Sequence, residues 1–164
     1  RGSPSATSPS AMSKRIKIIF PVPMNESTRE MVESQLPPEF IRPGYEVEFV
    51  GSSGLMTLAN TYYDMSIMEM IVLEAGMPAE EQGFDAVCIN TVSDSAFAAL
   101  RSRLSIPVFS PGQSAFHAAC MLGHRFSIVT MWEPWFPLYR KTLKEYGLEH
   151  RMASIRAIDV RPDV

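Results

Sequence analysis

Short apolar runs alternate with longer stretches in which apolar residues recur at helical spacing, from Lys14 to the end of the sequence. Side chains alternate between the two faces of a strand and repeat every three to four residues on one face of a helix. The apolar runs therefore predict strands at 15–20, 45–50, 86–89, 107–109, 126–130 and 154–157. The amphipathic stretches predict helices at 26–35, 58–75, 95–104 and 137–146, and one more that follows Gly112 and ends at Leu122.

This repeated alternation of strand and helix predicts an α/β fold with a parallel sheet and helices on both of its faces. Ala86–Ile89 is wholly apolar, which is typical of a central strand, whereas Tyr45–Val50 alternates polar and apolar residues and is predicted near an edge. The same order starts again at Pro107, so we expect a first α/β half over 13–105 and the beginning of a second over 106–164. Residues 1–12 are rich in Ser, Pro and Ala, and we expect a disordered remnant of an expression vector.

The amino-acid composition narrows the range of possible function classes and partners. The 164 residues are 46% hydrophobic and 20% charged, which is typical of a globular protein and excludes a disordered tail or a disulfide-stapled miniature. The net charge of −3 offers no basic face, so nucleic acid is not an expected partner. The apolar runs are shorter than the roughly 20 residues that span a bilayer, so no membrane partner is expected. The two cysteines, Cys88 and Cys120, are expected to be reduced thiols in the cytoplasm.

In a sheet of this kind, ligands bind beyond the carboxyl ends of the strands. The loops that follow the predicted strands are 21–25, 51–54, 90–94, 110–113 and 131–135, and they are rich in Ser, Thr, Asn and Gly with almost no cations. Hydroxyl groups and backbone N–H groups at helix starts can hold a carboxylate or an enolate oxygen. A small anion or a polarised carbonyl is therefore the expected ligand.

The loop 90–94 (NTVSD) is the strongest candidate, because it follows the most apolar strand and opens a helix with hydroxyl and amide groups. The alternative is that Ser93 or Asp94 only caps that helix. Asn25 is placed to cap the helix that follows it. Trp132 follows another strand, and its role stays open between packing and a pocket wall.

Other residues that could carry chemistry favour structural roles. Cys88 lies inside a predicted strand and Cys120 on a helix, so packing is the expected role of both thiols. His117 is interpreted as a hydrogen-bonded structural histidine, because no pair of histidines has metal-ligand spacing. The Gly51–Gly54 turn (GSSG) lacks the third glycine of a dinucleotide loop. No metal or nucleotide is therefore indicated.

Several stretches together resemble hydantoin racemases of the aspartate/glutamate racemase superfamily: KRIKIIF at 14–20, Ser53-Gly54 with Leu58 and Tyr63-Asp64 after it, GFDA at 83–86 and, most specifically, LGHRFSIVT at 122–130. The superfamily also includes allantoin and amino-acid racemases, maleate isomerase and arylmalonate decarboxylase. The resemblance implies two similar doubly wound parallel-sheet halves with the active site in the cleft between them. It also implies no cofactor, a small carboxylate or cyclic ureide as substrate, and a homo-oligomer.

The resemblance also implies a chemistry, in which one cysteine from each half acts on opposite faces of the substrate carbon. This sequence departs from that pattern at the first cysteine, where Thr91 stands instead. The family's Asn-Pro-Asn turn is Phe20-Pro21-Val22 here, with Asn25 the nearest amide. The second cysteine would lie beyond Val164, so we expect the sequence to continue in a longer protein.

The resemblance thus implies a catalytic role for Thr91, and substrate-binding roles for Asn25, Ser53, Gly54, Val92, Ser93 and Trp132. The hypothesis is a cofactor-independent racemase or isomerase that forms an enolate-type intermediate. A threonine hydroxyl is too weak an acid to serve unaided as the base, which keeps two alternatives open. They are a decarboxylase or other lyase with a single base, and a non-catalytic protein that binds a small molecule; an oligomeric scaffold has the least support.

Overall fold

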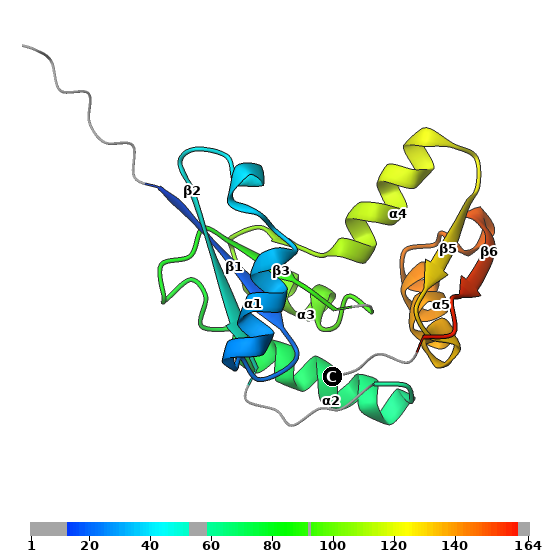
Figure 1. The fold of residues 1–164 in the computed structure, drawn as a ribbon, viewed down its shortest axis with the longest axis horizontal. Helices are drawn as coiled ribbons and strands as arrows, with labels where there is room; N and C mark the ends of the chain where they lie inside the picture. The colour runs from blue at the N-terminus through cyan, green and yellow to red at the C-terminus, as the bar shows by residue number, and fades with distance from the viewer. Residues whose placement is uncertain (1–12, 53–58, 92, 161–164) are drawn as a thin grey trace, which may run out of the picture.

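The computed structural model describes residues 13–52, 59–91 and 93–160, which form two lobes that each contain a parallel sheet (Figure 1). The strands are β1 (Lys14–Phe20), β2 (Tyr45–Gly51), β3 (Ala86–Ile89), β4 (Val108–Phe109), β5 (Phe126–Thr130) and β6 (Met152–Ala157). The helices are α1 (Glu26–Ser34), α2 (Tyr62–Gly76), α3 (Phe97–Arg103), α4 (Pro111–Leu122) and α5 (Phe136–Glu145). Three short 3₁₀ turns, Pro38–Phe40, Glu133–Trp135 and Glu149–Arg151, complete the regular structure.

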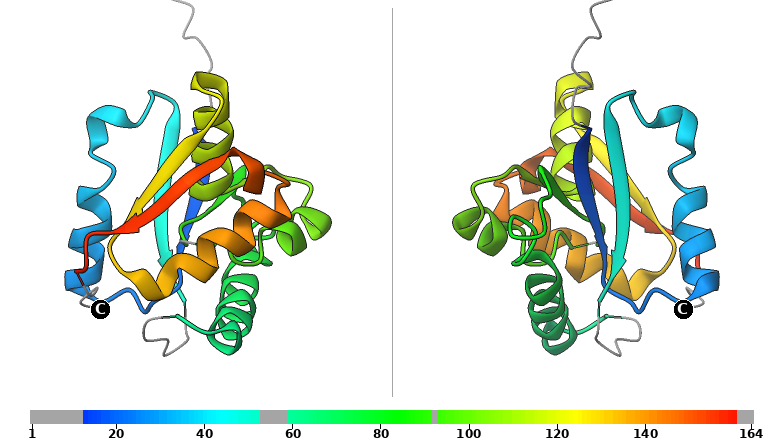
Figure 2. Two further views of the ribbon diagram at one scale, coloured as in Figure 1. Left: turned by 90° about the vertical axis from the view of Figure 1, so that its right-hand side faces the viewer. Right: turned by 90° about the vertical axis from the view of Figure 1, so that its left-hand side faces the viewer.

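The first sheet has the strand order β2-β1-β3-β4, and every neighbouring pair is parallel. The α/β class is therefore confirmed, with β3 inside the sheet and β2 at its edge as the hydrophobic pattern predicts. Figure 2 shows α1 and α2 on opposite sides of this sheet. The second sheet pairs β5 with β6, also in parallel, and carries α5 against it.

Each lobe has its own apolar core. In the first lobe, Ile19, Val87 and Ile89 point from the sheet towards Val72 of α2 and Leu100 of α3, and all five side chains are fully buried. In the second lobe a smaller cluster joins Phe116 of α4, Ile128 of β5 and Leu143 of α5. Burial of large apolar side chains stabilises the fold by about 1.5–3 kcal/mol each. Within the described residues, the larger of the two cores therefore supports the first sheet and the loops at its edge.

The pairing of β4 shows where the first sheet ends. The strand that was predicted to open the second half, β4, is hydrogen-bonded to β3 and completes the first sheet. The second sheet begins only at β5. The physical reason is that Val108 is buried in the core of the first lobe, so burial of its side chain places the strand there. The division into halves at residue 105 itself stays a prediction.

Two helix starts also differ from the hydrophobic pattern. Helix α2 begins at Tyr62, because the Thr61 side chain accepts a hydrogen bond from the Asp64 backbone and the Asp64 carboxylate bonds back to Thr61. Helix α3 begins at Phe97, two residues later than predicted, after Ala96 in the left-handed region (φ 60°). None of the helices in the described ranges is long and apolar enough to cross a membrane.

Candidate functional site

The loop that follows β3 is held by its own hydroxyl groups. The Ser95 backbone N–H donates to Thr91 Oγ1 at 2.8 Å, and the hydroxyls of Ser93 and Ser95 lie 2.8 Å apart. Thr91 is 9% exposed and Ser93 is 6% exposed, so both side chains lie almost wholly inside the protein. Because Thr91 Oγ1 accepts a hydrogen bond from the backbone, its own proton is left to donate to another oxygen.

Asp94, in the same loop, is buried and bonded on both oxygens. Oδ1 accepts from the Gly112 backbone N–H at 2.9 Å, while Oδ2 accepts from the Gln113 N–H and the Tyr146 hydroxyl, each at 2.7 Å. The carboxylate therefore caps the N-terminus of α4, where a negative charge is favoured. The sequence alternative of a cap on the following helix is wrong for Asp94, because α3 has no side-chain cap and the Gly112 N–H of the partner helix α4 lies 18 residues further on.

Gly112 is required by this arrangement. A Cβ atom at position 112 would lie 2.5 Å from Asp94 Oδ2 and 2.7 Å from Oδ1, which is closer than atoms of folded proteins approach. The α4 backbone can meet the carboxylate only because no side chain intervenes. The turn Ser110-Pro111-Gly112 thus leaves room for the Asp94 carboxylate at the N-terminus of α4.

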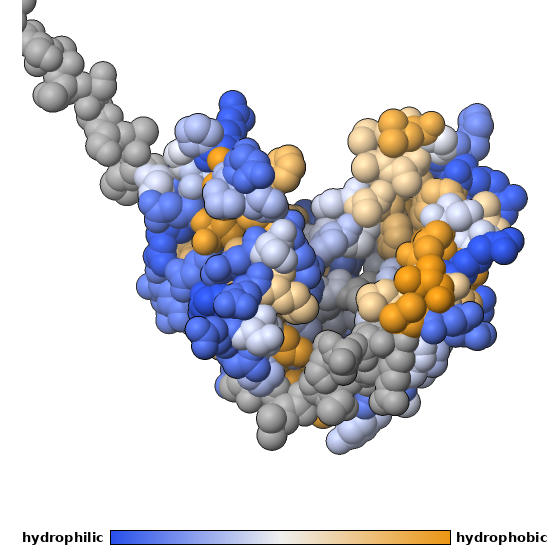
Figure 3. Space-filling model, viewed as in Figure 1, coloured by the Kyte–Doolittle hydropathy of each residue, from blue (hydrophilic) through white to orange (hydrophobic). Residues whose placement is uncertain are grey.

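The loop after β3 also contacts the second lobe. The Thr142 hydroxyl of α5 donates to the Ser93 carbonyl at 3.2 Å, and Tyr146 at the end of α5 donates to Asp94. Lys141 of α5 pairs with Glu69 of α2 at 3.1 Å nearby. Figure 3 shows the molecule hollowed between the two lobes. Thr91 and Ser93 are therefore held where the lobes join, which is where a ligand could contact both.

Cys88 lies three residues before Thr91, but its environment is different. The side chain is half-buried in β3, and burial, aided by the negative charge of Asp94, raises its pKa from 9.0 to about 11. Only the thiolate is a strong nucleophile or base, so Cys88 is a protonated and weakly reactive thiol at neutral pH. This agrees with the interpretation of Cys88 as a packing residue.

His117 of α4 and Tyr146 at the end of α5 lie next to each other, with the Tyr146 hydroxyl bonded to Asp94. His117 is exposed, its Nδ1 lies 2.8 Å from the Gln113 carbonyl oxygen, and its ring meets the Tyr146 ring edge-on. Burial and the hydrogen bond to Asp94 raise the pKa of Tyr146, so its phenol keeps its proton and donates it to the carboxylate. His117 is thus hydrogen-bonded within its own helix, in line with the structural interpretation.

Two other residues that the sequence predicts for the site, Asn25 and Trp132, lie after strands β1 and β5. Asn25 is exposed after β1, and its side-chain oxygen accepts from the Thr28 N–H at 2.8 Å, which confirms it as the cap of α1. Trp132 is half-buried after β5, where its ring meets Trp135 edge-on at 6.4 Å. Ser53, Gly54 and Val92 lie outside the described residues. Of the predicted site, the structure therefore brings together Thr91 and Ser93 in one loop.

Two further hydroxyls at strand ends were not singled out by the sequence. Ser52 after β2 and Ser110 after β4 are both buried. The Ser52 Oγ atom finds no hydrogen-bond partner within the described residues, whereas the Ser110 hydroxyl interacts with the Tyr146 hydroxyl. Buried polar atoms without partners are rare and call for an explanation such as a bound ligand or water. Ser52 and Ser110 both lie in loops that follow strands, where the topology of the sheet predicts ligand binding. Their positions at strand ends, and not the residue type serine, were therefore the signal available in the sequence.

A cavity of about 640 Å³ lies beside Asp94, between α2, α3, α4 and α5. It is lined by Glu69, Asp94, Ala96, Phe97, Ala98, Ala99, Gln113, Lys141, Glu145 and Tyr146. The hydroxyl groups of Thr91 and Ser93, which the sequence predicts to contact a substrate, therefore do not line this cavity.

Comparison with known proteins identifies the family. The profile described as Asp/Glu/hydantoin racemase matches residues 23–163, which is most of the chain. The chain belongs to the Asp/Glu/hydantoin racemase family. A hydantoin racemase of Pseudomonas sp. (strain NS671) is 31% identical over 96 residues, or 58% of this chain and 39% of that protein. The chain thus matches well under half the length of this relative of the racemase family.

Solved structures of racemase relatives have the same fold. Allantoin racemase from Klebsiella pneumoniae superposes with a TM-score of 0.80 at 29% identity, over 90% of this chain and 60% of that one. Unliganded arylmalonate decarboxylase superposes with a TM-score of 0.57 at 15% identity, over 92% of this chain and 63% of that one, a likeness of fold alone. The predicted racemase-superfamily resemblance and fold class are therefore confirmed.

Proposed function

We propose that the protein is a cofactor-independent racemase or isomerase that acts on a small carboxylate or hydantoin-like compound through an enolate-type intermediate. Membership of the racemase family carries this proposal, since the similar proteins named above are hydantoin and allantoin racemases. In such a reaction a base removes the proton next to a carbonyl group, and the electron pair moves onto the carbonyl oxygen. Return of a proton to the opposite face of the carbon inverts its configuration.

Thr91 has the role of a hydrogen-bond donor to the developing oxyanion in this proposal, and not that of the base. Its Oγ1 already accepts the Ser95 N–H, so in this proposal its own proton is donated to a substrate oxygen. Donors that are fixed before the reaction stabilise a developing charge more than water does, because they need no reorganisation. Ser93 and the buried hydroxyls of Ser52 and Ser110 extend this set of donors along the strand ends.

The base in this proposal comes from the opposite side of the substrate carbon. Cys88 is unsuited to the task, because its raised pKa keeps it protonated at neutral pH. Asp94 is unsuited too, because three hydrogen bonds already occupy its oxygens. The family's second cysteine, which the resemblance places beyond Val164, is the proposed base on one face of the substrate carbon. Inversion also needs a proton on the other face, and in this proposal a water molecule delivers it there, because Thr91 acts only as a hydrogen-bond donor.

A decarboxylase with a single base is the second candidate. It is favoured by one observation: the first family cysteine is replaced by Thr91, which leaves one side of the substrate without a thiol. Loss of CO₂ from a malonate leaves the same enolate-type intermediate, and one proton delivered from one side completes the reaction. The donors around Thr91 would hold the remaining carboxylate in both cases.

Deuterium exchange tests the proposal directly. The full-length protein is incubated in D₂O with hydantoins, amino acids, maleate and substituted malonates, and proton NMR follows loss of the signal from the carbon next to the carboxyl or carbonyl group. We expect exchange with at least one hydantoin or carboxylate, together with loss of optical rotation for a racemase. Product with deuterium on one face and release of CO₂ would identify the decarboxylase instead. Binding without exchange or product across the panel would contradict both and favour a non-catalytic binding protein.

A further inference from the structure

Two side chains at the C-terminal end of α5 reach from the second lobe to the loop after β3. Thr142 and Tyr146 lie one helical turn apart and therefore project from the same face of the helix. The Tyr146 hydroxyl donates to the Asp94 carboxylate at 2.7 Å, a hydrogen bond that the negative charge strengthens. The single proton of the Thr142 hydroxyl is shared between the Ser93 and Leu138 carbonyl oxygens, at 3.2 and 3.0 Å. Tyr146 therefore makes the stronger of the two contacts with the loop.

The ring of Tyr146 lies where the two apolar cores meet. Among the described residues, Tyr146 alone packs against both the core of the first lobe and the core of the second. Its ring meets the Phe97 ring of α3 edge-on at 6.2 Å and the His117 ring of α4 at 5.8 Å. These contacts fix the direction of the Tyr146 hydroxyl relative to both lobes.

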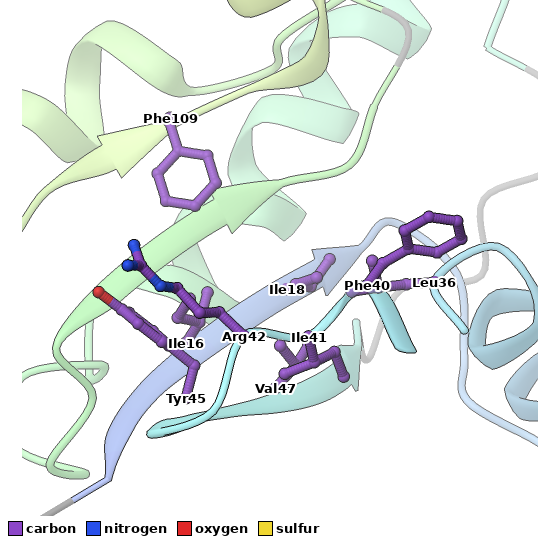
Figure 4. Close-up of a pocket in the computed structure, with 9 residues that line it drawn as sticks. All are labelled: Ile16, Ile18, Leu36, Phe40, Ile41, Arg42, Tyr45, Val47 and Phe109. Carbon is purple, nitrogen blue, oxygen red and sulfur yellow. The ribbon is translucent and has the colours of Figure 1, made fainter. Parts of the chain in front are cut away.

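The contacts of Tyr146 lie on the packed face of the first sheet. The core that it joins lies on the side of α2 and α3, where Ile19 and Leu100 are fully buried. The opposite face, over Ile16 and Ile18, has a cavity of about 310 Å³ among the described residues (Figure 4). The link between the lobes therefore runs through side chains that already pack together, and it does not depend on what contacts the other face.

The loop that Tyr146 contacts has a strained backbone. Asp94 and Ala96 both lie in the left-handed region, with φ of 48° and 60°, which residues other than glycine rarely adopt. Such residues keep their conformation only where the surrounding contacts hold them. Between these two residues, the Ser95 backbone N–H donates to Thr91 Oγ1 at 2.8 Å. The direction of the Thr91 hydroxyl therefore depends on the contacts that hold Asp94 in place.

We propose that Tyr146 is a positioning residue for the reaction at Thr91. Its hydroxyl holds Asp94, Asp94 holds the strained loop, and the loop fixes the Thr91 hydroxyl through the Ser95 N–H. Because Tyr146 belongs to the second lobe, the hydrogen bond from Thr91 to the substrate is in place when the two lobes keep this arrangement. This role rests on the proposed function, since Thr91 is the group that is positioned.

The variant Tyr146→Phe removes the hydroxyl alone and keeps the aromatic ring between the two cores. Asp94 retains its two backbone N–H donors in this variant, so the N-terminus of α4 stays capped and the protein should fold. Tyr139→Phe is the matched control. Tyr139 is also on α5, but its hydroxyl lies 3.1 Å from Thr130 Oγ1 within the second lobe.

Hydrogen exchange of the full-length protein, followed by NMR, examines the loop without a substrate. We expect the Ser95 amide to exchange about tenfold faster in Tyr146→Phe, because the loop opens more often once the carboxylate loses the phenol. The Val87 amide, which is hydrogen-bonded inside the first sheet, should keep its rate, as should both amides in Tyr139→Phe. An unchanged Ser95 rate in Tyr146→Phe, or equal acceleration of Ser95 and Val87, would overturn the proposal.

A double-mutant cycle then tests whether the held loop matters for catalysis. With the substrate found in the D₂O panel, Tyr146→Phe should lower kcat/KM about fivefold in the wild-type background and less than about twofold in Thr91→Val, because the positioned hydroxyl is then absent. Equal losses in the two backgrounds would show a general structural effect and overturn the proposal. Absence of turnover in the wild type would instead contradict the proposed function, and the Ser95 exchange rate would still decide whether Tyr146 holds the loop.

Discussion

Strand β3 and the loop that follows it show how position decides the chemistry of a side chain. Cys88, inside the strand, is the more nucleophilic residue type, yet burial raises its pKa to about 11. Thr91, three residues later, is a poor nucleophile, yet its hydroxyl stands at a strand end with a proton free to donate. The comparison teaches that the candidate chemistry belongs to the loop, whose shape is fixed by its own hydroxyl groups together with contacts to the second lobe.

The largest expected effect comes from removing the carboxylate that fixes the loop. Asp94→Ala leaves two backbone N–H groups and the Tyr146 hydroxyl without their acceptor. Hydrogen bonds to charged groups stabilise a protein by about 1.5–3 kcal/mol each, so we expect unfolding free energy to fall by about 3 kcal/mol or more. Urea denaturation measures this fall in the free energy of unfolding. Glu33→Ala, which breaks only an exposed pair with Arg29, is the control and should change stability by less than about 0.5 kcal/mol.

The next effect is a difference in thiol reactivity between Cys88 and a cysteine placed at position 91. A pKa raised by two units, from 9.0 to about 11, lowers the thiolate fraction of Cys88 near pH 8 about a hundredfold. Because the raised pKa delays loss of the proton, its alkylation rate should still be rising between pH 9 and 11. Iodoacetamide labelling with peptide mass spectrometry follows Cys88 and the new thiol of Thr91→Cys in one sample. Faster labelling of Cys88 than of position 91 would reverse the comparison.

A smaller effect is expected when the helix end can no longer approach the loop. In Gly112→Ala the new Cβ would meet the Asp94 carboxylate at 2.5 Å, so the carboxylate or the α4 backbone must shift. Overpacking of this kind costs about 1–3 kcal/mol, and thermal unfolding should show a loss of about 2 kcal/mol. Gly123→Ala, at the other end of the same helix, places its Cβ 3.6 Å from the Arg125 carbonyl oxygen and is the matched control. Equal losses in the two variants would remove the special role of Gly112.

The strands could be predicted closely because burial governs them. Ala86–Ile89 and Phe126–Thr130 have the predicted bounds. The first fits a strand inside a sheet, and the second buries one face, with Ile128 and Thr130 inside and Val129 exposed. The candidate loop was also placed correctly at a strand end, because the carboxyl edge of a parallel sheet follows from topology alone.

What escaped prediction depends on contacts between distant residues. Asp94 caps helix α4 through Gly112, which lies 18 residues later, and no local pattern distinguishes that partner from the helix that follows directly. The pairing of β4 with β3 depends in the same way on where Val108 finds apolar neighbours. The unpartnered hydroxyl of Ser52 is a property of burial in three dimensions, which a single serine in a loop does not reveal.

The rate of deuterium exchange in Thr91 variants tests the central claim most directly. With the substrate found in the D₂O panel, Thr91→Val removes the hydroxyl and keeps the shape, whereas Thr91→Ser keeps the hydroxyl. We predict that kcat/KM falls at least tenfold in Thr91→Val, about 1.4 kcal/mol of transition-state stabilisation, and stays within about threefold in Thr91→Ser. Circular dichroism and unfolding show that both variants fold. An unchanged kcat/KM in folded Thr91→Val would contradict the claim that the loop after β3 supplies the hydrogen bond to the intermediate.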